Sequence, residues 1–370
     1  MRHSTFLEVN LGLLQENISK IKKLAPAKII PMVKADAYGN GLIPVSKFLV
    51  EECGMNRLGC ASLGEALRLF NQCPDLNAEM MVFSDTEISN PDVAEAYNNY
   101  AITPVLHLKS DVERVLIDSN LKKIPLVIKV NTGMNRLGLS LNELADIAPQ
   151  LKNRGVKHLL THFACSYYPL KAGDKTHRQF DEFNQAKKIL KDAGVSVQET
   201  SVANSGAIEQ KFGVNETFVR PGLMMYGPQS VEPRIWDGHQ ISRFVTKVLK
   251  TFEVKKGTPV GYGINVAGED GFVVVLPIGY ADLSLTNSTI TGSEITLNGF
   301  KGKIFARVNM DMMFVIFDMS VSGKIKVGDS VEFWNHDNRV INELANQMKT
   351  IPYQMMCGLT GRIPRIYKVK

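Results

Sequence analysis

Short apolar runs alternate with amphipathic segments from Ile29 to about Gly227, and this alternation limits the possible folds more than any other feature. The runs are rich in Val, Ile, Leu, Met and Phe, which suits strands buried on both faces of a parallel sheet. Helical patterns lie between them, as at Leu63–Phe70 and Asp174–Ala193. The eight runs are Ile29–Asp36, Arg57–Ser62, Glu79–Asp85, Ala101–His107, Leu126–Thr132, Val156–Ala164, Val197–Asn204 and Phe218–Gly227.

Eight strand-and-helix units within roughly 200 residues predict an α/β fold built on a (β/α)8 TIM-like barrel. A doubly wound open sheet is the alternative. The glycine-rich turn that such a sheet uses for dinucleotides does not follow the first run, which favours the barrel.

The pattern changes after Trp236, where helical periodicity largely gives way to short β-like runs separated by turn signals. We therefore expect a barrel domain over residues 1–236 and a mostly β domain over 237–370, with residues 1–10 free to add a strand to the second domain. One helix is predicted at Val340–Thr350. The β-like runs are Ile241–Val254, Phe272–Tyr280, Ser293–Met310 and Met313–Met319.

The composition is that of a globular chain, with 44% hydrophobic and 22% charged residues among 370. The net charge of +6 is not gathered into blocks, so we expect no nucleic-acid partner. No apolar run approaches the length of a membrane span, and the first ten residues lack the apolar stretch of a secretory signal. With five irregularly spaced cysteines, the sequence predicts a cytoplasmic protein with free thiols and no membrane partner.

Two lysines stand out because they lie in apolar runs that are predicted to be strands. Lys34 is in the first run, and Lys129 is in the fifth, before Asn131–Gly138. Burial disfavours a charged amine, lowers its pKa and makes it nucleophilic, as a lysine that binds a carbonyl compound requires. A lysine that extends from a strand end to solvent is the alternative.

Small and polar residues follow the seventh and eighth runs, which is where barrels commonly bind phosphate. Asn204-Ser205-Gly206 ends the seventh run, and the eighth contains Arg220-Pro221-Gly222-Leu223. Small residues with accessible backbone amides suit a phosphate group. Ser205-Gly206 also fits an ordinary helix cap, but two such loops in this pair of positions favour the phosphate site.

His158 and His162 lie four residues apart and raise the question of a metal. No carboxylate or cysteine accompanies them at ligand spacing, and the motif H-E-x-x-H is absent from the sequence, so we expect no metal. His162, at a predicted strand end, fits a core residue or one that stacks against a cofactor. In the β domain, Tyr262 lies between two glycines on a turn, where it is either a hairpin tyrosine or a general base with a lowered pKa.

These residues together resemble alanine racemase, a pyridoxal-phosphate enzyme with a barrel and a β domain, and the resemblance covers essentially the whole chain. Its most specific element is Val33–Gly41, VKADAYGNG, which is similar to the family's cofactor-lysine signature. The resemblance implies pyridoxal 5'-phosphate as the cofactor, with Lys34 as its point of covalent attachment. It further implies Tyr38, Ser205, Gly222, Leu223 and Tyr353 at the phosphate, Arg220 at the pyridine nitrogen, His162 beside the ring and Asn204 nearby.

The resemblance also implies the substrate side of the site. Arg136 would meet the phenolic oxygen and the substrate carboxylate, and Lys129 matches a lysine that is carbamylated in some members. The family supplies Tyr262 from the partner subunit as a second base, which implies a homodimer with shared sites. At the entrance and substrate side, the resemblance implies Tyr280, Met310 and Asp311.

The implied reaction is the racemisation of L-alanine and D-alanine, feeding D-alanine to peptidoglycan synthesis. Lys34 and Tyr262 would remove and return the Cα proton on opposite faces. Arginine only donates hydrogen bonds, so Arg220 would leave the pyridine nitrogen unprotonated, which we infer limits transamination.

Other activities on the same scaffold remain alternatives. Asn309 stands where many members have cysteine, and Leu283 where glycine is frequent, so a serine or broad-spectrum amino-acid racemase is the main one. A non-catalytic pyridoxal-phosphate carrier would end near the barrel's end. A decarboxylase of this fold would use a C-terminal catalytic cysteine, and Cys357 is interpreted as a packing residue.

Overall fold

Eight parallel strands form the barrel domain of this computed structural model, which describes residues 4–90, 93–284 and 290–369. Their spatial order is β2-β9-β8-β7-β6-β5-β4-β3. Hydrogen bonds from Val33 N to Gly59 O (2.8 Å) and from Gly59 N to Pro31 O (2.9 Å) connect the two end strands and nearly close the ring. The barrel prediction is therefore confirmed. The strands are β2 Lys28–Ile29, β3 Arg57–Ser62, β4 Glu79–Asp85, β5 Ile102–Leu106, β6 Val127–Lys129, β7 Val156–Leu160, β8 Val197–Ser201 and β9 Phe218–Val219.

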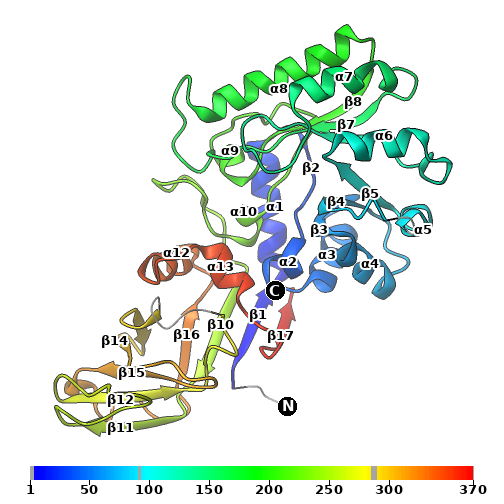
Figure 1. The fold of residues 1–370 in the computed structure, drawn as a ribbon. Helices are drawn as coiled ribbons and strands as arrows, with labels where there is room; N and C mark the ends of the chain where they lie inside the picture. Colours follow the sequence, from blue (N-terminus) through cyan, green and yellow to red (C-terminus); the bar gives the residue numbers. More distant parts are fainter. Residues whose placement is uncertain (1–3, 91–92, 285–289, 370) are drawn as a thin grey trace.

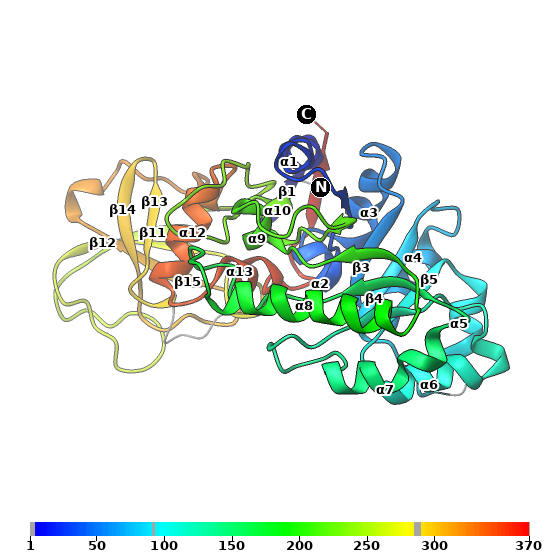
Figure 2. The ribbon, with the colours of Figure 1, turned by 90° about the horizontal axis from the view of Figure 1, so that it is seen from above.

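Helices cover the outside of the barrel, as Figures 1 and 2 show. The longest, α8, buries residues at three- and four-residue spacing, including Phe183, Ala186 and Leu190, and Asp174 caps its first turn. No helix in the described part of the chain is long and apolar enough to cross a membrane. The barrel helices are α1 Leu11–Leu24, α2 Lys34–Tyr38, α3 Leu42–Glu51, α4 Leu63–Gln72, α5 Val93–Asn99, α6 Lys109–Ile117, α7 Leu141–Leu151, α8 Lys175–Asp192, α9 Ser205–Glu209 and α10 Leu223–Tyr226, with a 3-10 turn at Ser119–Leu121.

The first and last strands are shorter than the sequence pattern predicted. The strand β2 ends at Ile29, and Lys34 opens the short turn α2 instead of lying in a strand. The strand β9 ends at Val219, directly before Arg220, and Leu223–Tyr226 is helical. The prediction of strand structure was wrong in these two places because each apolar run continues past its strand into a buried turn.

The turn α2 has left-handed backbone geometry, which is rare for residues other than glycine. Ala35, Asp36, Ala37 and Tyr38 have φ angles of 52° to 54°. Tertiary hydrogen bonds hold this turn, since Glu65 Oε1 accepts from Ala35 N at 2.6 Å and Asp36 Oδ1 accepts from the backbone N of residue 42 at 3.0 Å. The backbone therefore reverses direction sharply, directly after Lys34.

Two antiparallel-rich sheets form most of the second domain, which lies below the barrel in Figure 1. The four-stranded sheet has the order β16-β10-β1-β17, and the five-stranded sheet has the order β11-β12-β15-β14-β13. The prediction of a separate, mostly β domain is confirmed. Its elements are β1 Phe6–Asn10, β10 Ser242–Lys247, β11 Lys250–Val254, β12 Gly271–Leu276, β13 Glu294–Leu297, β14 Phe300–Phe305, β15 Met313–Phe317, β16 Ser330–Trp334, β17 Arg365–Lys368, α12 Asn338–Gln347 and α13 Pro352–Cys357, with a 3-10 turn at Met319–Val321.

The two domains meet through both ends of the chain. The strand β1 pairs with β10 and β17 in the β domain and leads directly into α1 of the barrel. Helix α13 lies against α2, where a Cβ on Gly39 would come within 2.1 Å of Met356 O. This contact brings Tyr353 to 5.8 Å from Tyr38, measured between ring centroids, and so places a C-terminal residue at the barrel mouth.

Candidate active site

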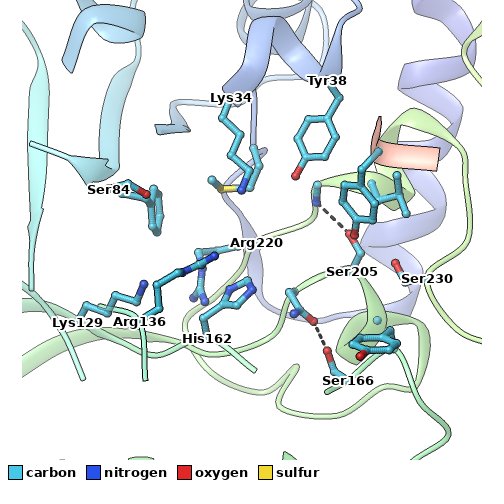
Figure 3. Close-up of a pocket in the computed structure, with 18 residues that line it drawn as sticks. Lys34, Tyr38, Ser84, Lys129, Arg136, His162, Ser166, Ser205, Arg220 and Ser230 are labelled. Atoms are coloured by element: carbon cyan, nitrogen blue, oxygen red, sulfur yellow. Dashed lines mark hydrogen bonds between the residues drawn. The ribbon is translucent and has the colours of Figure 1, made fainter. Parts of the chain in front are cut away.

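A cavity of about 170 Å³ lies at the carboxyl ends of the barrel strands (Figure 3). Parallel strands end on the same face of a barrel, so the loops that follow them converge there. The residues that line it are Met32, Lys34, Tyr38, Phe83, Ser84, Lys129, Arg136, His162, Ser166, Tyr167, Asn204, Ser205, Gly206, Arg220, Gly222, Leu223, Ser230 and Tyr353.

The cavity is strongly cationic. Lys34, Lys129, Arg136 and Arg220 all line it, and none of the lining residues within the described ranges is an aspartate or glutamate. Figure 3 shows Lys129, Arg136, Arg220 and His162 grouped on one side. Because four cations without a carboxylate repel one another, the site is suited to an anionic ligand.

The two lysines have lowered basicity. Burial, followed by the charge of Arg136, lowers the pKa of Lys34. Burial, followed by the charges of Arg136, Arg220 and Lys34, lowers the pKa of Lys129 to about 8. A larger share of each side chain is therefore the neutral amine at neutral pH, which is the nucleophilic form.

Arg220 is buried, and backbone oxygens hold one side of its guanidinium. Its Nη2 donates to Thr161 O at 2.5 Å and to Val202 O at 3.3 Å. Burial lowers the pKa of Arg220 to about 9, so it stays protonated at neutral pH. Half-buried His162 lies beside it, and burial together with the charge of Arg220 lowers the pKa of His162 well below its ordinary value. His162 is therefore a neutral imidazole next to fixed positive charge.

The other side of the cavity carries hydroxyl groups, and the backbone of Gly222 lies close to one of them. Figure 3 shows Tyr38, Ser205 and Ser230 there, away from the grouped cations. Ser205 Oγ accepts from Gly222 N at 3.0 Å and so ties the loop after β8 to the loop after β9. A Cβ on Gly222 would lie 2.2 Å from the Tyr38 hydroxyl, so only glycine allows this approach.

Asn204, and not Ser205, caps helix α9. Its Oδ1 accepts from Ala207 N at 3.2 Å and from Ser166 Oγ at 2.6 Å, and its Nδ2 donates to Phe163 O at 3.1 Å. The Ser205 oxygen accepts from Gly222 N and Met224 N, so its hydroxyl proton is left to donate at the cavity wall, which favours the phosphate-site hypothesis over a cap of α9 for that residue.

Comparison with protein families accounts for both domains. Residues 9–230 match the alanine racemase N-terminal domain, and residues 241–367 match the alanine racemase C-terminal domain. The chain belongs to the alanine racemase family. It is therefore an amino-acid racemase, and the enzyme class that the sequence predicted is confirmed.

Individual alanine racemases resemble the chain over nearly its full length. Alanine racemase 2 of Caldanaerobacter subterraneus subsp. tengcongensis is 32% identical over 98% of this chain and 94% of its own. Among solved structures, the alanine racemase of Streptomyces coelicolor A3(2) has a TM-score of 0.87 at 22% identity, covering 99% of this chain and 98% of that one. The Bacillus anthracis alanine racemase with bound L-Ala-P has a TM-score of 0.85 at 25% identity, covering 100% and 97%.

The structure brings most of the predicted alanine racemase site residues to one cavity. Those that line it are Lys34, Tyr38, Lys129, Arg136, His162, Asn204, Ser205, Arg220, Gly222, Leu223 and Tyr353. Four others lie in exposed positions of the β domain and, within the described chain, do not line it: Tyr262, Tyr280, Met310 and Asp311. A single alanine racemase chain thus presents two separate groups of predicted functional residues.

Several residues that line this cavity were missed by sequence reasoning. Phe83 and Ser84 lie at the end of β4, and Ser166 and Tyr167 follow the sixth apolar run, Val156–Ala164. The position of these residues after predicted strands was a usable signal, because every strand end of a barrel contributes to the same face. Met32 and Ser230, which were also missed, line the cavity as well, together with Gly206 of the predicted phosphate loop.

Proposed function

We propose that the chain interconverts L-alanine and D-alanine with pyridoxal 5'-phosphate bound in the cavity. The observation that carries this proposal is the convergence of Lys34, with its lowered pKa, with three further cations on a carboxylate-free cavity wall in the described chain. An amine of that kind can bind an aldehyde, and the cations fit a phosphate and a substrate carboxylate. We further propose that the D-alanine feeds peptidoglycan synthesis in the cytoplasm.

The residues present fit the cofactor. The hydroxyls of Tyr38, Ser205 and Tyr353, and the close approach of Gly222, suit a phosphate group. Arg220 lines the cavity, and its bonds to Thr161 O and Val202 O hold the guanidinium in place, so one of its remaining donors would suit the pyridine nitrogen. When bound, pyridoxal phosphate supplies the electron sink that makes the Cα proton of an amino acid acidic.

Lys34 would serve both as the cofactor's point of attachment and as one of the two bases. With the substrate bound, the Lys34 amine would accept the Cα proton from one face. Its lowered pKa keeps a neutral fraction available for this step. The second base must act on the opposite face. Among the described residues, the one β-domain tyrosine that lines this chain's own cavity is Tyr353, which lies beside Tyr38 on the proposed phosphate side, and Tyr262 does not line it.

Tyr262 would act on the cavity of the partner subunit. It is 67% exposed, and Ile264, two residues further along the same loop, is 98% exposed. A loop that exposes such large apolar side chains suits an interface between two copies better than a free surface.

Mixing two inactive variants tests the shared site. Lys34→Ala and Tyr262→Phe should each lose at least about 100-fold in kcat as homodimers, because each lacks one base. Random reassociation of equal amounts should restore about a quarter of the wild-type activity, since about half of the dimers are mixed and each has one complete site. Racemisation of L-alanine, followed by circular dichroism or chiral chromatography, provides the measurement.

The same experiment has an internal control. Tyr100 is a half-exposed tyrosine of the barrel that does not line the cavity, so Tyr100→Phe should keep full activity. If the mixed variants stay inactive although mixed dimers form, each site is complete within one chain and the two-base proposal with a partner's tyrosine fails.

A serine or broad-spectrum racemase is the second candidate function. Asn309 Oδ1 is buried without a hydrogen-bond partner in the described structure and lies next to Met310, on the predicted substrate side. An unpaired amide oxygen there would accept a hydrogen bond from a substrate hydroxyl. Rates across L-alanine, L-serine and larger amino acids decide between the two, and a higher kcat/KM for serine would refute the alanine assignment.

A further inference from the structure

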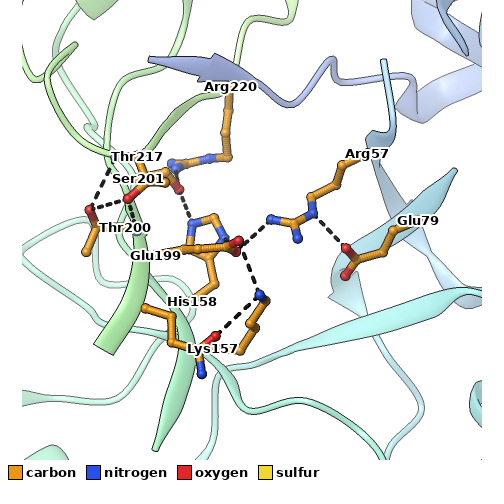
Figure 4. A network of polar contacts seen from close by, with 10 residues as sticks. Arg57, Glu79, Lys157, His158, Glu199, Thr200, Ser201, Thr217 and Arg220 are labelled. Atoms are coloured by element: carbon orange, nitrogen blue, oxygen red, sulfur yellow. Dashed lines mark hydrogen bonds and ion pairs between the residues drawn. The ribbon is translucent and has the colours of Figure 1, made fainter. Parts of the chain in front are cut away.

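The inside of the barrel holds a connected series of polar side chains below the cavity (Figure 4). Barrel interiors are usually filled by branched apolar residues. Here His158 precedes the lumen residue Leu160 by two positions on β7, so both side chains point to the same face of the strand. His158 and Ser201 are fully buried, and Phe218 stacks on the imidazole at 5.6 Å between centroids.

This series starts at Arg220 in the cavity wall. Arg220 Nη1 donates to Ser201 Oγ, and Ser201 Oγ lies 2.7 Å from His158 Nε2. The next group is Glu199, whose Oε2 lies 3.6 Å from His158 Nδ1. That distance is too long for a hydrogen bond but directs the Nδ1 side of the imidazole toward a carboxylate.

Two cations hold Glu199 in place at the far end. Arg57 Nη1 bonds to Glu199 Oε2 at 2.7 Å, and Lys157 Nζ lies 3.3 Å from Glu199 Oε1. Arg57 Nε also pairs with Glu79 at 2.7 Å. The carboxylate that faces His158 is therefore fixed by strands β3, β4 and β7 as well as by its own strand.

The donors and acceptors along this series allow one arrangement. Arginine has no acceptor, so Ser201 Oγ must accept from Arg220. The Ser201 hydroxyl is buried, and besides Arg220 it contacts His158. Its proton is therefore donated to His158 Nε2. Nε2 must then be unprotonated, and a neutral His158 carries its proton on Nδ1, facing Glu199.

The electrostatics agree with a neutral His158. Burial, followed by the charges of Arg220, Arg57 and Lys157, lowers the pKa of His158 well below its ordinary value. A protonated imidazole at this place would present an Nε2–H to Ser201, so Ser201 Oγ would accept from both neighbours and its own buried proton would lose His158 as an acceptor.

We infer that His158 and Ser201 are positioning residues for Arg220. They fix the guanidinium from the interior side, while Thr161 O and Val202 O fix its Nη2. The remaining donors of Arg220 are thereby held toward the cavity. This inference rests on the proposed function, because it assigns the series a role in how Arg220 meets the pyridine nitrogen.

The protonation state of His158 can be measured on the unmodified holoenzyme. Histidine labelled with ¹⁵N distinguishes the two neutral tautomers and the cation by the shifts of the ring nitrogens. We expect the His158 signal, assigned by its loss in His158→Phe, to show a protonated Nδ1 and an unprotonated Nε2 from pH 6 to 9. A protonated Nε2 in this range would overturn the inference without depending on any variant's activity.

Three variants test the effect on the cofactor. Ser201→Ala removes the acceptor of Arg220 and should weaken pyridoxal phosphate binding about tenfold and raise pyridoxamine phosphate formed per racemisation turnover. His158→Phe should shift both quantities in the same direction. His158→Gln keeps an acceptor for the Ser201 hydroxyl and should restore both toward wild type, which a role in packing alone does not predict.

A matched control is available in His107, a buried histidine at the end of β5 that does not line the cavity. His107→Phe should leave cofactor affinity and the ratio of pyridoxamine phosphate to racemisation unchanged. If Ser201→Ala and His158→Phe behave like this control while the wild type racemises alanine, the positioning role is refuted. If the wild type itself does not racemise amino acids, the proposed function fails instead, and the tautomer measurement still tests the hydrogen-bond arrangement.

Discussion

The contact between Gly222 and Tyr38 provides a sharp test of how the cofactor site is built. In Gly222→Ala, the new Cβ would lie 2.2 Å from the Tyr38 hydroxyl oxygen and 3.0 Å from Tyr38 Cζ. Such a distance to oxygen is far below van der Waals contact, so one of the two groups must move. The Tyr38 ring is buried against Tyr226 and Tyr353, at 4.8 Å and 5.8 Å between centroids, which leaves it little room.

The size of the effect follows from this geometry. Forcing an extra methyl group into a packed site costs about 1–3 kcal/mol of unfolding free energy. Displacing the Tyr38 hydroxyl would also remove its proposed hydrogen bond to the cofactor phosphate, and such a bond to an anionic group is worth about 1.5–3 kcal/mol, so cofactor affinity should fall roughly 10- to 100-fold. We therefore expect Gly222→Ala to lower both the stability and the affinity for pyridoxal phosphate.

Unfolding of the cofactor-free protein in denaturant and a spectroscopic titration with pyridoxal phosphate measure the two effects. Tyr38→Phe removes the atom at 2.2 Å and leaves the one at 3.0 Å, so Gly222→Ala should cost less than about 1 kcal/mol in that background. Gly64→Ala is the matched control, because this helical glycine has only a serine oxygen at 3.9 Å. It should stabilise the protein by about 0.5–1 kcal/mol.

Additive effects of Gly222→Ala and Tyr38→Phe would refute this reasoning, because the argument depends on one specific contact. Unchanged stability and affinity in Gly222→Ala alone would refute it as well. Equal losses in Gly222→Ala and Gly64→Ala would mean that the added methyl group acts in some way unrelated to the distance from Tyr38.

Three further predictions concern residues at or directly after the carboxyl ends of the barrel strands. Ala35 is exposed with φ 52°, so Ala35→Gly should raise the free energy of unfolding by about 0.5–1 kcal/mol in denaturant titrations, and a loss of stability would contradict the strain argument. The pKa of Lys129 is lowered from 10.5 to about 8, so the unfolded chain binds the extra proton between these values and stability rises with pH there. Lys129→Met should therefore be more stable than wild type below pH 8 by a margin that shrinks toward pH 10, and a margin independent of pH would count against the buried amine. Arg220→Glu should increase pyridoxamine phosphate formation per turnover, because a carboxylate favours a protonated pyridine nitrogen, and an unchanged ratio would refute that role.

Much of the fold was predictable because a barrel repeats a local pattern. Each strand needs a short run buried on both faces, and such runs can be recognised one at a time. The same regularity predicted that Lys129, Asn204 and Arg220 would meet, since they follow different strands on one face of the barrel. Predictions were wrong where a run such as Ile29–Asp36 continues past its strand.

The left-handed turn at Lys34 could not be read from local preferences. For Ala35, Asp36 and Ala37 the positive φ values are unfavourable in isolation. They persist because Glu65 and the contact of Gly39 with α13 hold the turn from elsewhere in the fold. The intrinsic preferences of the turn residues do not include these partners. Glu65 lies 30 residues from Ala35, and the contact in α13 lies more than 300 residues from Gly39.

The sequence by itself determined the barrel, the separate β domain and the residue types at the strand ends, because these depend on the periodicity of apolar residues and on their immediate neighbours. Only the tertiary structure decided that Gly39 packs against α13 and that His158 and Ser201 support Arg220 from within the barrel. These features depend on which side chains face one another across strands and domains. Because these side chains are buried, water cannot replace a lost partner, so each contact fixes the charge, the hydrogen bonds and the position of the groups that make it.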